Sequence, residues 1–552
     1  MPKILINEKD YTSPGTPGSY GNYTVLITGY QKEFTSAQIT AANTAISDYK
    51  TAIATKSAII PVLDETATMI MARQEAIDAN GAYEFNSKQA FEDIIGECSD
   101  EKTFTILGEE DPRIETHYGN RMARELLSLG YPIIYKPIQT ILDMNDEAFW
   151  ECFKDKANYD FRFISHGMLE TVYSEEALDE LKARLDDVKL DVAKFKEVED
   201  AEDYESYLSA EAVNKKSDGS LYFTDGSLQY SYDQALIQYT EEDGVIPAIS
   251  AAEEAIAAYD TTAITPTVFN NINAIIANLA SYKTGLTAGR GDCTALIELD
   301  EKCYVSGVGK PEHRIVNGIN AMTGINGNVG AYCAMTVPSV YYKGIVGKLP
   351  GAFHYLACFM NSISSGFAEW YAVAGYTRGV SSYIIDRTSV KLGEIAINTL
   401  EPRNIIDQSS QPKFACNVIA NFRGSYYLWG NRTAEPVQQA NGGGDLVASH
   451  FLNIRQLCST IKKQLYVSCR RFTFDPNSDT LWYSFTGSIV PTLEKMKADQ
   501  GIRDYKIIKV RTDKKATLKA KIRIIPVEAV EDFDIEISLE DSFGETSVVA
   551  NG

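Results

Sequence analysis

The sequence lacks the cysteine and histidine patterns that hold metals or build disulfide frameworks. It has no Cys-x-x-Cys pair, no His-x-x-x-His pair and no His-Glu-x-x-His motif. The cysteines are odd in number and scattered, at Cys98, Cys152, Cys293, Cys303, Cys333, Cys358, Cys416, Cys458 and Cys469. This pattern is typical of reduced, mostly buried thiols made in a cytosol. The histidines also lack ligand spacing, and they are His117, His166, His313, His354 and His450. We therefore expect no metal and no other cofactor.

Long apolar runs and positive charge are both scarce. No run of about 18 apolar residues occurs, and no charged-then-apolar signal opens the chain, so we expect neither a membrane span nor Sec export. Lys and Arg number 52 against 75 Asp and Glu, which gives a net charge of -23. This excess of acid disfavours sequence-independent binding to nucleic acid and to an anionic membrane. High like charge also keeps a concentrated protein soluble until specific contacts form.

Catalytic and nucleotide-binding motifs are missing as well. Gly307-Val308-Gly309-Lys310 resembles a phosphate loop only superficially, because Pro311 stands where the Walker motif needs Ser or Thr. No Gly-x-Ser-x-Gly elbow occurs. Arg290-Gly291-Asp292 leads directly into an apolar segment, so we expect a turn before a strand and not an adhesion loop. We expect that the protein is not an enzyme, with an α/β hydrolase as the alternative from another class.

The whole chain of 552 residues has the length of about three or four domains. Residues 1–22 form a polar start with Pro14, Pro17 and three glycines, which predicts an extended arm. Strands are predicted at 23–29, 132–135, 159–164 and 293–297. Helices are predicted within 35–80 (one or two), at 85–98 with Ser87 as N-cap, at 121–129 and at 271–282. This alternation favours an α/β fold with a parallel sheet.

An acidic stretch interrupts the alternation. Residues 173–245 contain 20 Asp and Glu against 7 Lys and Arg. An Ala-rich helix is expected to follow at 249–258. We interpret 173–266 as an inserted, solvent-facing domain; the alternative is a disordered acidic linker. The interleaved aromatic residues disfavour the linker, and they are Tyr222, Phe223, Tyr230, Tyr232 and Tyr239.

The last third contains further predicted elements. Trp370–Gly379 is predicted to be a short strand that ends in a tight turn. Gly442–Gly444 marks a boundary or loop, and the apolar spacing from Ile454 to Leu465 predicts an amphipathic helix. A turn at 474–477, a strand at 481–485 and a helix opened by Pro491 follow. Tyr426, Tyr427 and Trp429 are either ordinary strand and core residues or a buried interface with another copy.

Two strands with alternating charge dominate the C-terminal part. Lys519–Ile524 and Phe533–Glu540 both alternate at period 2, so each has one apolar and one charged face. The first charged face is basic and the second nearly all acidic, which favours pairing in a hairpin or between neighbouring copies. The candidate interface residues are Lys519, Lys521, Ile522, Arg523, Phe533, Asp534, Ile535, Glu536, Ile537 and Leu539.

Several segments, in order, resemble contractile-tail sheath proteins of bacteriophages. They are 159–164, 290–297, 349–356, 370–379, 427–433, the helix that begins at 451, and 519–541. The resemblance implies a discontinuous, subtilisin-like α/β sheath domain (23–172 and 267–440) without a protease triad. It also implies a small α+β, tube-facing C-terminal domain with a strand-exchange arm (441–552). Residues 35–80 and 173–266 do not share in the resemblance.

The resemblance also implies a function. Copies would stack as six-membered rings around a tail tube, and the N-terminal arm and C-terminal strand of each copy would add to sheets in its neighbours. Contraction would drive the tube through the host envelope for genome delivery. The implied partners are the protein itself, the tube, the baseplate and the terminator or neck proteins, with no nucleic acid and no membrane insertion. The protein would be assembled in the host cytoplasm and reside in the virion. The alternative is the sheath of a bacterial contractile injection system.

Overall fold

The structure is a computed structural model that describes residues 23–57, 59–106, 109–171, 265–282, 289–402, 412–436, 446–511 and 517–529, with a few positions between 182 and 253. Between 103 and 114 it describes the backbone only. The predicted arm 1–22, the helix 249–258 apart from Glu253, the loop 442–444 and the strand 533–540 lie outside the described residues. The chain divides into two compact units, Met1–Thr473 and Phe474–Gly552. The predicted boundary at 441 falls within the first unit, and the domain limits stay a prediction.

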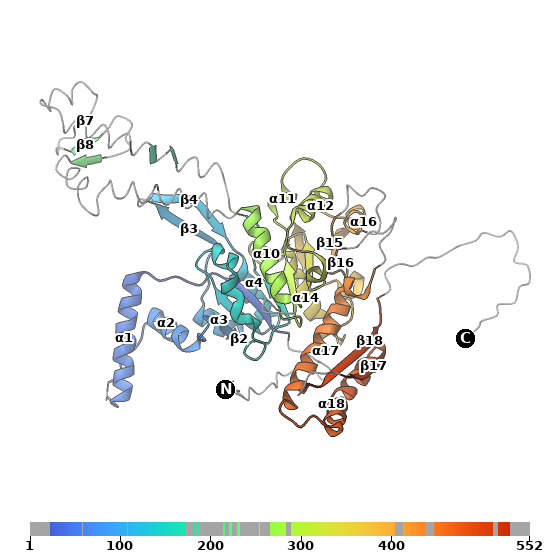
Figure 1. Ribbon diagram of the computed structural model, residues 1–552. Helices are drawn as coiled ribbons and strands as arrows, with labels where there is room; N and C mark the ends of the chain where they lie inside the picture. The colour runs from blue at the N-terminus through green and yellow to red at the C-terminus, as the bar shows by residue number, and fades with distance from the viewer. Residues whose placement is uncertain are drawn as a thin grey trace, which may run out of the picture. The chain divides into compact units, whose positions relative to one another are not determined.

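An eight-stranded sheet is the centre of the first unit (Figure 1). Its spatial order is β16 (Ser425–Trp429), β15 (Asn417–Phe422), β11 (Cys333–Val337), β10 (Thr294–Ile297), β6 (Phe163–Ser165), β1 (Val25–Gly29), β5 (Ile133–Pro137) and β2 (Tyr83–Phe85). The six inner strands are parallel, and the two edge strands are antiparallel to their neighbours. The predicted α/β class with a parallel sheet is confirmed.

Helices cover both faces of this sheet because its strands are apolar on both sides. Leu26 packs into one core with Phe269 and Ile276 of α10 (Pro266–Ala280). The neighbouring Val25 and Ile27 pack into the other core with Leu126 of α4 (Gly119–Ser128). The first core also receives α12 (Pro311–Ala321) and α16 (Glu394–Leu400), and the second receives α3 (Lys88–Ile94) and α14 (Gly351–Ser364).

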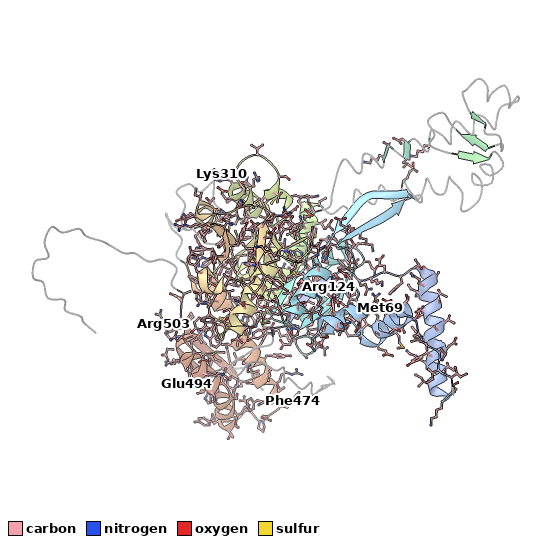
Figure 2. All side chains as sticks on the ribbon, turned by 180° about the vertical axis from the view of Figure 1, so that it is seen from behind. Met69, Arg124, Lys310, Phe474, Glu494 and Arg503 are labelled. Carbon is pink, nitrogen blue, oxygen red and sulfur yellow. The ribbon has the colours of Figure 1, made fainter. Side chains whose placement is uncertain are left out.

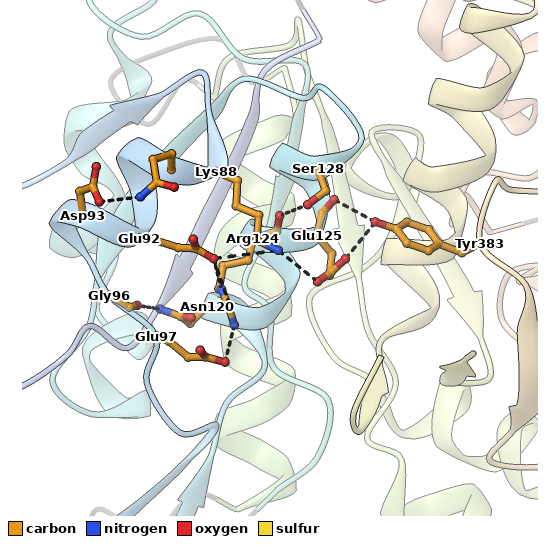
Figure 3. A network of polar contacts seen from close by, with 11 residues as sticks. Lys88, Glu92, Asp93, Gly96, Glu97, Asn120, Arg124, Glu125, Ser128 and Tyr383 are labelled. Atoms are coloured by element: carbon orange, nitrogen blue, oxygen red, sulfur yellow. Dashed lines mark hydrogen bonds and ion pairs between the residues drawn. The ribbon is translucent and has the colours of Figure 1, made fainter. Parts of the chain in front are cut away.

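Charged side chains join α3 to α4 at the surface (Figure 3). The Arg124 guanidinium bonds Glu92 at 3.0 Å and Glu97 at 2.7 Å, and Glu125 accepts a hydrogen bond from Tyr383 at 2.9 Å. Ser87 caps α3 by accepting a hydrogen bond from the Ala90 N–H, as predicted. These contacts hold the two helices in place over their face of the sheet.

Smaller elements surround the sheet. Helices α1 (Ser36–Ala54) and α2 (Glu65–Ala76) fill the segment 35–80, as predicted. Further strands form a ribbon, β3 (Glu101–Ile106) with β4 (Glu109–Thr116), and a three-stranded sheet of β13 (Lys348–Leu349), β12 (Val340–Tyr342) and β14 (Ile385–Thr388). Another sheet, β7 (Asn214–Lys215), β8 (Ser220–Tyr222) and β9 (Gln229–Ser231), lies within the predicted insertion. Short helices are η1 (Ile141–Asn145), α5 (Glu147–Glu151), η2 (Cys152–Lys154), α11 (Lys302–Val305), α13 (Gly327–Gly330), α15 (Gly375–Arg378) and η5 (Ala448–His450).

The predicted amphipathic helix is α17 (Leu452–Arg471), and its buried face is unusually polar. Ile454, Leu457 and Ile461 are buried as expected. The same helix also buries Gln456 and Thr460, which accept hydrogen bonds from the fully buried Arg162 guanidinium at 3.4 and 2.7 Å. Buried polar groups stabilise only when they find partners, so these bonds fix how α17 packs within the first unit.

The second unit consists of a long helix and a two-stranded sheet. Helix α18 (Asp479–Ala498) begins at the N-cap Ser478, whose Oγ accepts a hydrogen bond from the Leu481 N–H. It is followed by β17 (Ile502–Val510) and β18 (Lys519–Pro526). The turn predicted at 474–477 is confirmed, with Phe474 84% exposed (Figure 2).

Three sequence predictions were wrong. Residues 481–485 are helical, and Pro491 lies inside α18 and does not open a new helix. The apolar stripe of Phe485, Ile489, Leu493 and Met496 continues through the proline and outweighs its local cost, because burial of this face stabilises one uninterrupted helix. Trp370–Gly379 forms no strand. Its backbone is irregular up to α15, and Arg378 donates a hydrogen bond to the Ala372 carbonyl, which lies outside any sheet ladder.

Candidate assembly interface

The strand β18 carries the basic part of the predicted interface, and its neighbour is β17. Ile522 lies opposite Ile507, and Arg523 lies opposite Lys506. Residues directly opposite each other in an antiparallel pair share a face of the sheet. One face therefore contains Tyr505, Ile507, Ile522 and Ile524. The other face contains Ile508 and four cations. It is called here the basic face, and its cations are Lys506, Lys519, Lys521 and Arg523.

The apolar face packs on α18. Ile522 and Ile524 are partly buried, in alternation with the exposed Lys521 and Arg523, which confirms the two-faced strand. The Tyr505 hydroxyl donates a hydrogen bond to Glu494 of α18 at 2.5 Å, and this bond raises the pKa of Tyr505 to about 12. Lys509 pairs with Asp479 at the N-terminus of the helix at 2.7 Å. Glu494 and Arg503 are labelled in Figure 2. These contacts direct the basic face away from α18.

The basic face concentrates positive charge, and one carboxylate, Asp504, shares it. Arg523 and Lys506 are directly opposite each other, and like charges in that position destabilise a strand pair. Within the part of the chain that the structure describes, no ion pair includes Lys506, Lys519, Lys521 or Arg523. Two other ion pairs join this sheet to α18, Asp504 with Lys497 at 3.1 Å and Lys509 with Asp479 at 2.7 Å. An acidic segment that lies on this face would remove the repulsion.

Both edges of the β17–β18 sheet are open among the described residues, because this sheet has two strands only. Unpaired backbone N–H and C=O groups at such an edge can accept a further strand. The chain after β18 is strongly acidic: between 528 and 552 it has no Lys or Arg, and its acids are Glu528, Glu531, Asp532, Asp534, Glu536, Glu540, Asp541 and Glu545. The acidic strand at 533–540 stays a prediction, and β17, the strand that completes the basic face, was not predicted from the sequence.

The predicted acidic partners are not placed by the structure. Phe533, Asp534, Ile535, Glu536, Ile537 and Leu539 lie outside the described residues, so their pairing stays a prediction. The structure places Lys519, Lys521, Ile522 and Arg523 together on one strand, with Ile522 on the opposite face from the cations.

The carboxyl edge of the large sheet is the place where open α/β sheets bind ligands. Glu298 follows β10 and is buried against the N-terminus of α14, and burial raises the pKa of its carboxyl. The nearby Glu301 accepts a hydrogen bond from Ser339 and forms an ion pair with Lys348. The Ser339 hydroxyl therefore donates to a carboxylate that an ion pair with Lys348 also holds.

A cysteine and a histidine also meet on α14, but they cannot act as a nucleophile and base. Cys358 Sγ lies 3.4 Å from His354 Nε2, and both are fully buried. Burial raises the pKa of the Cys358 thiol well above its usual value and lowers the pKa of His354 to about 3. Both groups stay neutral, whereas a reactive cysteine is a thiolate in a partly exposed, electropositive place.

Other motifs have structural roles. Arg290 and Asp292 are buried and paired with each other at 3.0 Å, so this tripeptide forms the predicted turn before β10. Arg314 binds the carbonyl oxygens of Tyr304 and Gly307, which holds the glycine loop before α12. Among the described residues, no group of His, Cys, Asp and Glu could hold a metal ion. No described helix is long and apolar enough to cross a membrane.

Comparisons with known proteins give structural neighbours only. No family model matches the chain, and no curated protein matches it. A contracted sheath complex of an extracellular contractile injection system (PVC) aligns over 98% of both chains, with 10% identity and a TM-score of 0.47. A six-fold symmetrised baseplate of the anti-feeding prophage aligns over 55% of this chain and 80% of that one, with 14% identity and a TM-score of 0.36. At these identities and TM-scores the two likenesses define neither the function of this chain nor a site.

Proposed function

We propose that this protein is the subunit of a contractile sheath and that it polymerises with itself around a tail tube. The observation that carries the proposal is the β17–β18 sheet, which has two strands and open edges among the described residues and has a basic face. The charged residues of the C-terminal stretch that follows it are all acidic. A chain that carries both an open sheet and a strand of complementary charge can link to identical copies in series. The ordered sheath-like segments of the sequence support the same function.

In this proposal, the segment 533–540 of one copy adds to the β17–β18 sheet of a neighbour. Asp534 and Glu536 then meet Lys521 and Arg523. Each backbone hydrogen bond contributes about 0.5–1.5 kcal/mol, so four to six bonds contribute a few kcal/mol per contact. A single contact of this strength is weak, and many repeated contacts hold a lattice together. The N-terminal arm 1–22 adds to neighbouring sheets in the same way.

The contraction follows from the same linkage. The first unit moves as a rigid body while the added strands keep neighbouring copies connected, and new contacts between bodies stabilise the contracted state. The energy for contraction is then stored at assembly, and contraction requires no nucleotide or metal. The subtilisin-like arrangement of the sheath domain, with the insertion 173–266 outermost, is part of this proposal.

We favour a bacteriophage sheath over that of a bacterial injection system, because a single long chain with a large acidic insertion fits the phage class better. The partners are then the tube, the baseplate and the terminator or neck proteins, the assembled protein belongs to the virion, and contraction serves genome delivery. A hydrolase is disfavoured because Glu301, which accepts the hydrogen bond of Ser339, is held in an ion pair by Lys348, and because Cys358 and His354 are fully buried and neutral.

The test is removal of the acidic strand. A chain that ends at residue 532 retains α18, β17 and β18, so it should keep the circular dichroism and melting temperature of the full chain but remain in the supernatant after ultracentrifugation. The matched control carries Asp534→Asn and Glu536→Gln, which keeps the strand and removes its charge, and should assemble weakly. Normal tubes from the truncated chain would show that this strand does not link the copies.

A further inference from the structure

The outer edge of β18 presents backbone groups in a regular order. Among the described residues, β18 pairs with β17 alone (Figure 1). The Val527 N–H donates a hydrogen bond to the Gly501 carbonyl at 3.1 Å, so position 527 faces β17. Backbone groups alternate in direction along a strand, and those of three residues therefore point to the open edge: Ala520, Ile522 and Ile524. Pro526 falls in the same series, and an open edge is where a strand tolerates proline.

The predicted acidic strand begins close to this edge along the chain. β18 ends at Pro526 and the predicted strand begins at Phe533, so residues 527–532 connect the two. Connections of about two to six residues are the commonest between neighbouring elements. Neighbouring strands lie about 4.8 Å apart, a distance that such a connection spans easily. Covalent linkage therefore keeps the acidic strand within reach of its own β18.

The two strands match in length and in apolar pattern. β18 covers eight residues, and the predicted strand 533–540 covers the same number. A hairpin closed by the connection pairs position 526 with position 533 in antiparallel fashion. On the apolar face it would place isoleucine opposite isoleucine, Ile524 with Ile535 and Ile522 with Ile537. The apolar face on α18 would thereby gain a third strand.

The same register would bring opposite charges together on the basic face. Arg523 would lie opposite Glu536, and Lys519 would lie opposite Glu540. Opposite charges on facing strands stabilise the pair. A slip by one residue would place Arg523 opposite an isoleucine at 535 or 537, so the strict alternation of both strands selects against it.

A strand on the same chain competes strongly with the identical strand of another copy. A short connection gives the tethered strand an effective concentration in about the mM range. Free copies at lower concentration therefore pair mostly with themselves. Exchange of an identical element between copies makes the same contacts again, so it costs little once other contacts bring the copies together.

We propose that in a free copy the segment 533–540 pairs with the open edge of its own β18 and closes the edge to a neighbour's strand. Copies then assemble by exchanging this strand. The inference deepens the proposed function, and its consequence for assembly rests on that function. The pairing within one chain is a property of the isolated copy and is measured without tubes.

The experiment is disulfide trapping in the full-length protein. Position 521 would lie opposite 538 in a non-hydrogen-bonded pair, whose Cα atoms are about 4.5 Å apart, within the range of a disulfide. We expect Lys521→Cys with Ser538→Cys to form a link within one chain. A Cys469→Ser background removes the exposed native thiol. The matched control is Lys521→Cys with Leu539→Cys, whose second thiol would lie on the opposite face and should not link.

Mixing isotope-labelled with unlabelled copies separates a link within one chain from a link between chains. Mass spectrometry of the linked peptides should find no mixed pairs. The linked fraction should not change between about 0.1 and 10 µM protein, far below the effective concentration of the tether. Mixed pairs alone would overturn the proposal in favour of pairing between copies. Equal linking at 538 and 539 would also overturn it, because the register would then be undefined.

Hydrogen exchange of the unaltered protein gives a second measurement that needs no substitution. In the monomeric full chain, the amides of Ala520, Ile522 and Ile524 should exchange about tenfold more slowly than in a chain that ends at residue 532. The amides of Lys521 and Arg523 face β17 in both chains and serve as the internal control. Equal exchange at the three edge amides would overturn the proposal.

The outcomes also separate this inference from the proposed function. The self-linked chain should form no tubes until it is reduced, because its strand cannot exchange. Tubes from the self-linked chain would overturn the claim that this pairing closes the edge. A self-link followed by no tubes after reduction would support the pairing and contradict the sheath function. Tubes from a protein that shows neither the self-link nor edge protection would support the sheath function and overturn this inference.

Discussion

Two buried histidines at the carboxyl edge of the sheet should make the first unit sensitive to acid. His117 Nδ1 accepts a hydrogen bond from the Gly119 N–H at 3.1 Å, and its Nε2 lies 2.7 Å from the His166 carbonyl oxygen. His166 Nδ1 accepts from the Met168 N–H at 3.0 Å, and its Nε2 lies 3.0 Å from Asn273 Oδ1. Both rings are thus satisfied as neutral imidazoles. A second ring proton would face a backbone N–H.

Burial accordingly lowers the pKa of His117 to about 3 and that of His166 to about 4, from 6.5. The unfolded chain then binds protons below pH 6.5 that the folded chain does not bind. Stability is therefore present at neutral pH and is lost as the pH falls from about 6.5 towards 4. Between pH 8 and 5 the loss is about 2 kcal/mol per histidine, against a total stability of about 5–15 kcal/mol.

Two carboxyls act in the opposite direction. Burial raises the pKa of Asp100 to about 6 in spite of its ion pair with Arg121, and it raises the pKa of Glu298. Each holds a proton in the folded state that the unfolded state has released, so its effect favours folding as the pH falls. The pH dependence of the wild-type stability contains both effects, that of the histidines and that of the carboxyls. The readout is therefore the difference between each variant and the wild type.

The assay is urea unfolding at pH 8, 6.5, 5.5 and 5, with His166→Gln and His117→Gln. Each variant loses stability at pH 8, because a hydrogen-bonded ring is gone. Each should also lose about 2 kcal/mol less than the wild type between pH 8 and 5. The matched control is His313→Gln, because His313 is exposed on α12 and surrounded by water in both states. An unchanged pH slope in both buried variants would refute the account of these histidines as neutral structural groups.

Two further predictions follow from the charges and the thiols. Changing Lys519, Lys521 and Arg523 together to Glu should weaken assembly, most at low salt, because like charges would face Asp534 and Glu536; sedimentation against salt measures this, with Lys310→Glu as the exposed control. Unchanged assembly at low salt would mean that those faces do not meet. In thiol labelling of the native protein, Cys469 should react first because it is exposed, and Cys358 should react only on unfolding, because burial raises the pKa of its thiol. Rapid native labelling of Cys358 would contradict its inert role.

Much of the central sheet could be predicted from local patterns. Strands β1, β5 and β10 are short apolar runs with polar or glycine boundaries, and α4 and α10 show helical spacing. The predicted strand at 159–164 is shorter in the structure, where β6 covers Phe163–Ser165. Tyr159 and Phe161 are buried in the core without forming a ladder, because apolar character alone does not decide between a strand and a packed loop.

The C-terminal unit shows where local reasoning stops. Pro491 indicates a helix start in isolation, yet the stripe from Phe485 to Met496 continues the helix through it. β17 was missed because adjacent apolar residues, Ile507 and Ile508, interrupt its alternation, and a register shift follows Ile502. The basic face of β18 was predictable because its period is strict. Its neighbour was not, since strand pairing depends on contacts distant in the sequence.

The most direct test of the sheath function is negative-stain electron microscopy of the purified full-length protein at high concentration. The account predicts hollow tubes with six-fold end views, and their loss in the chain that ends at residue 532. Monomers that persist at high concentration and moderate salt, also in the presence of preformed tail tubes and baseplates, would contradict it. The carboxyl edge of the large sheet would then be the place to search for another activity.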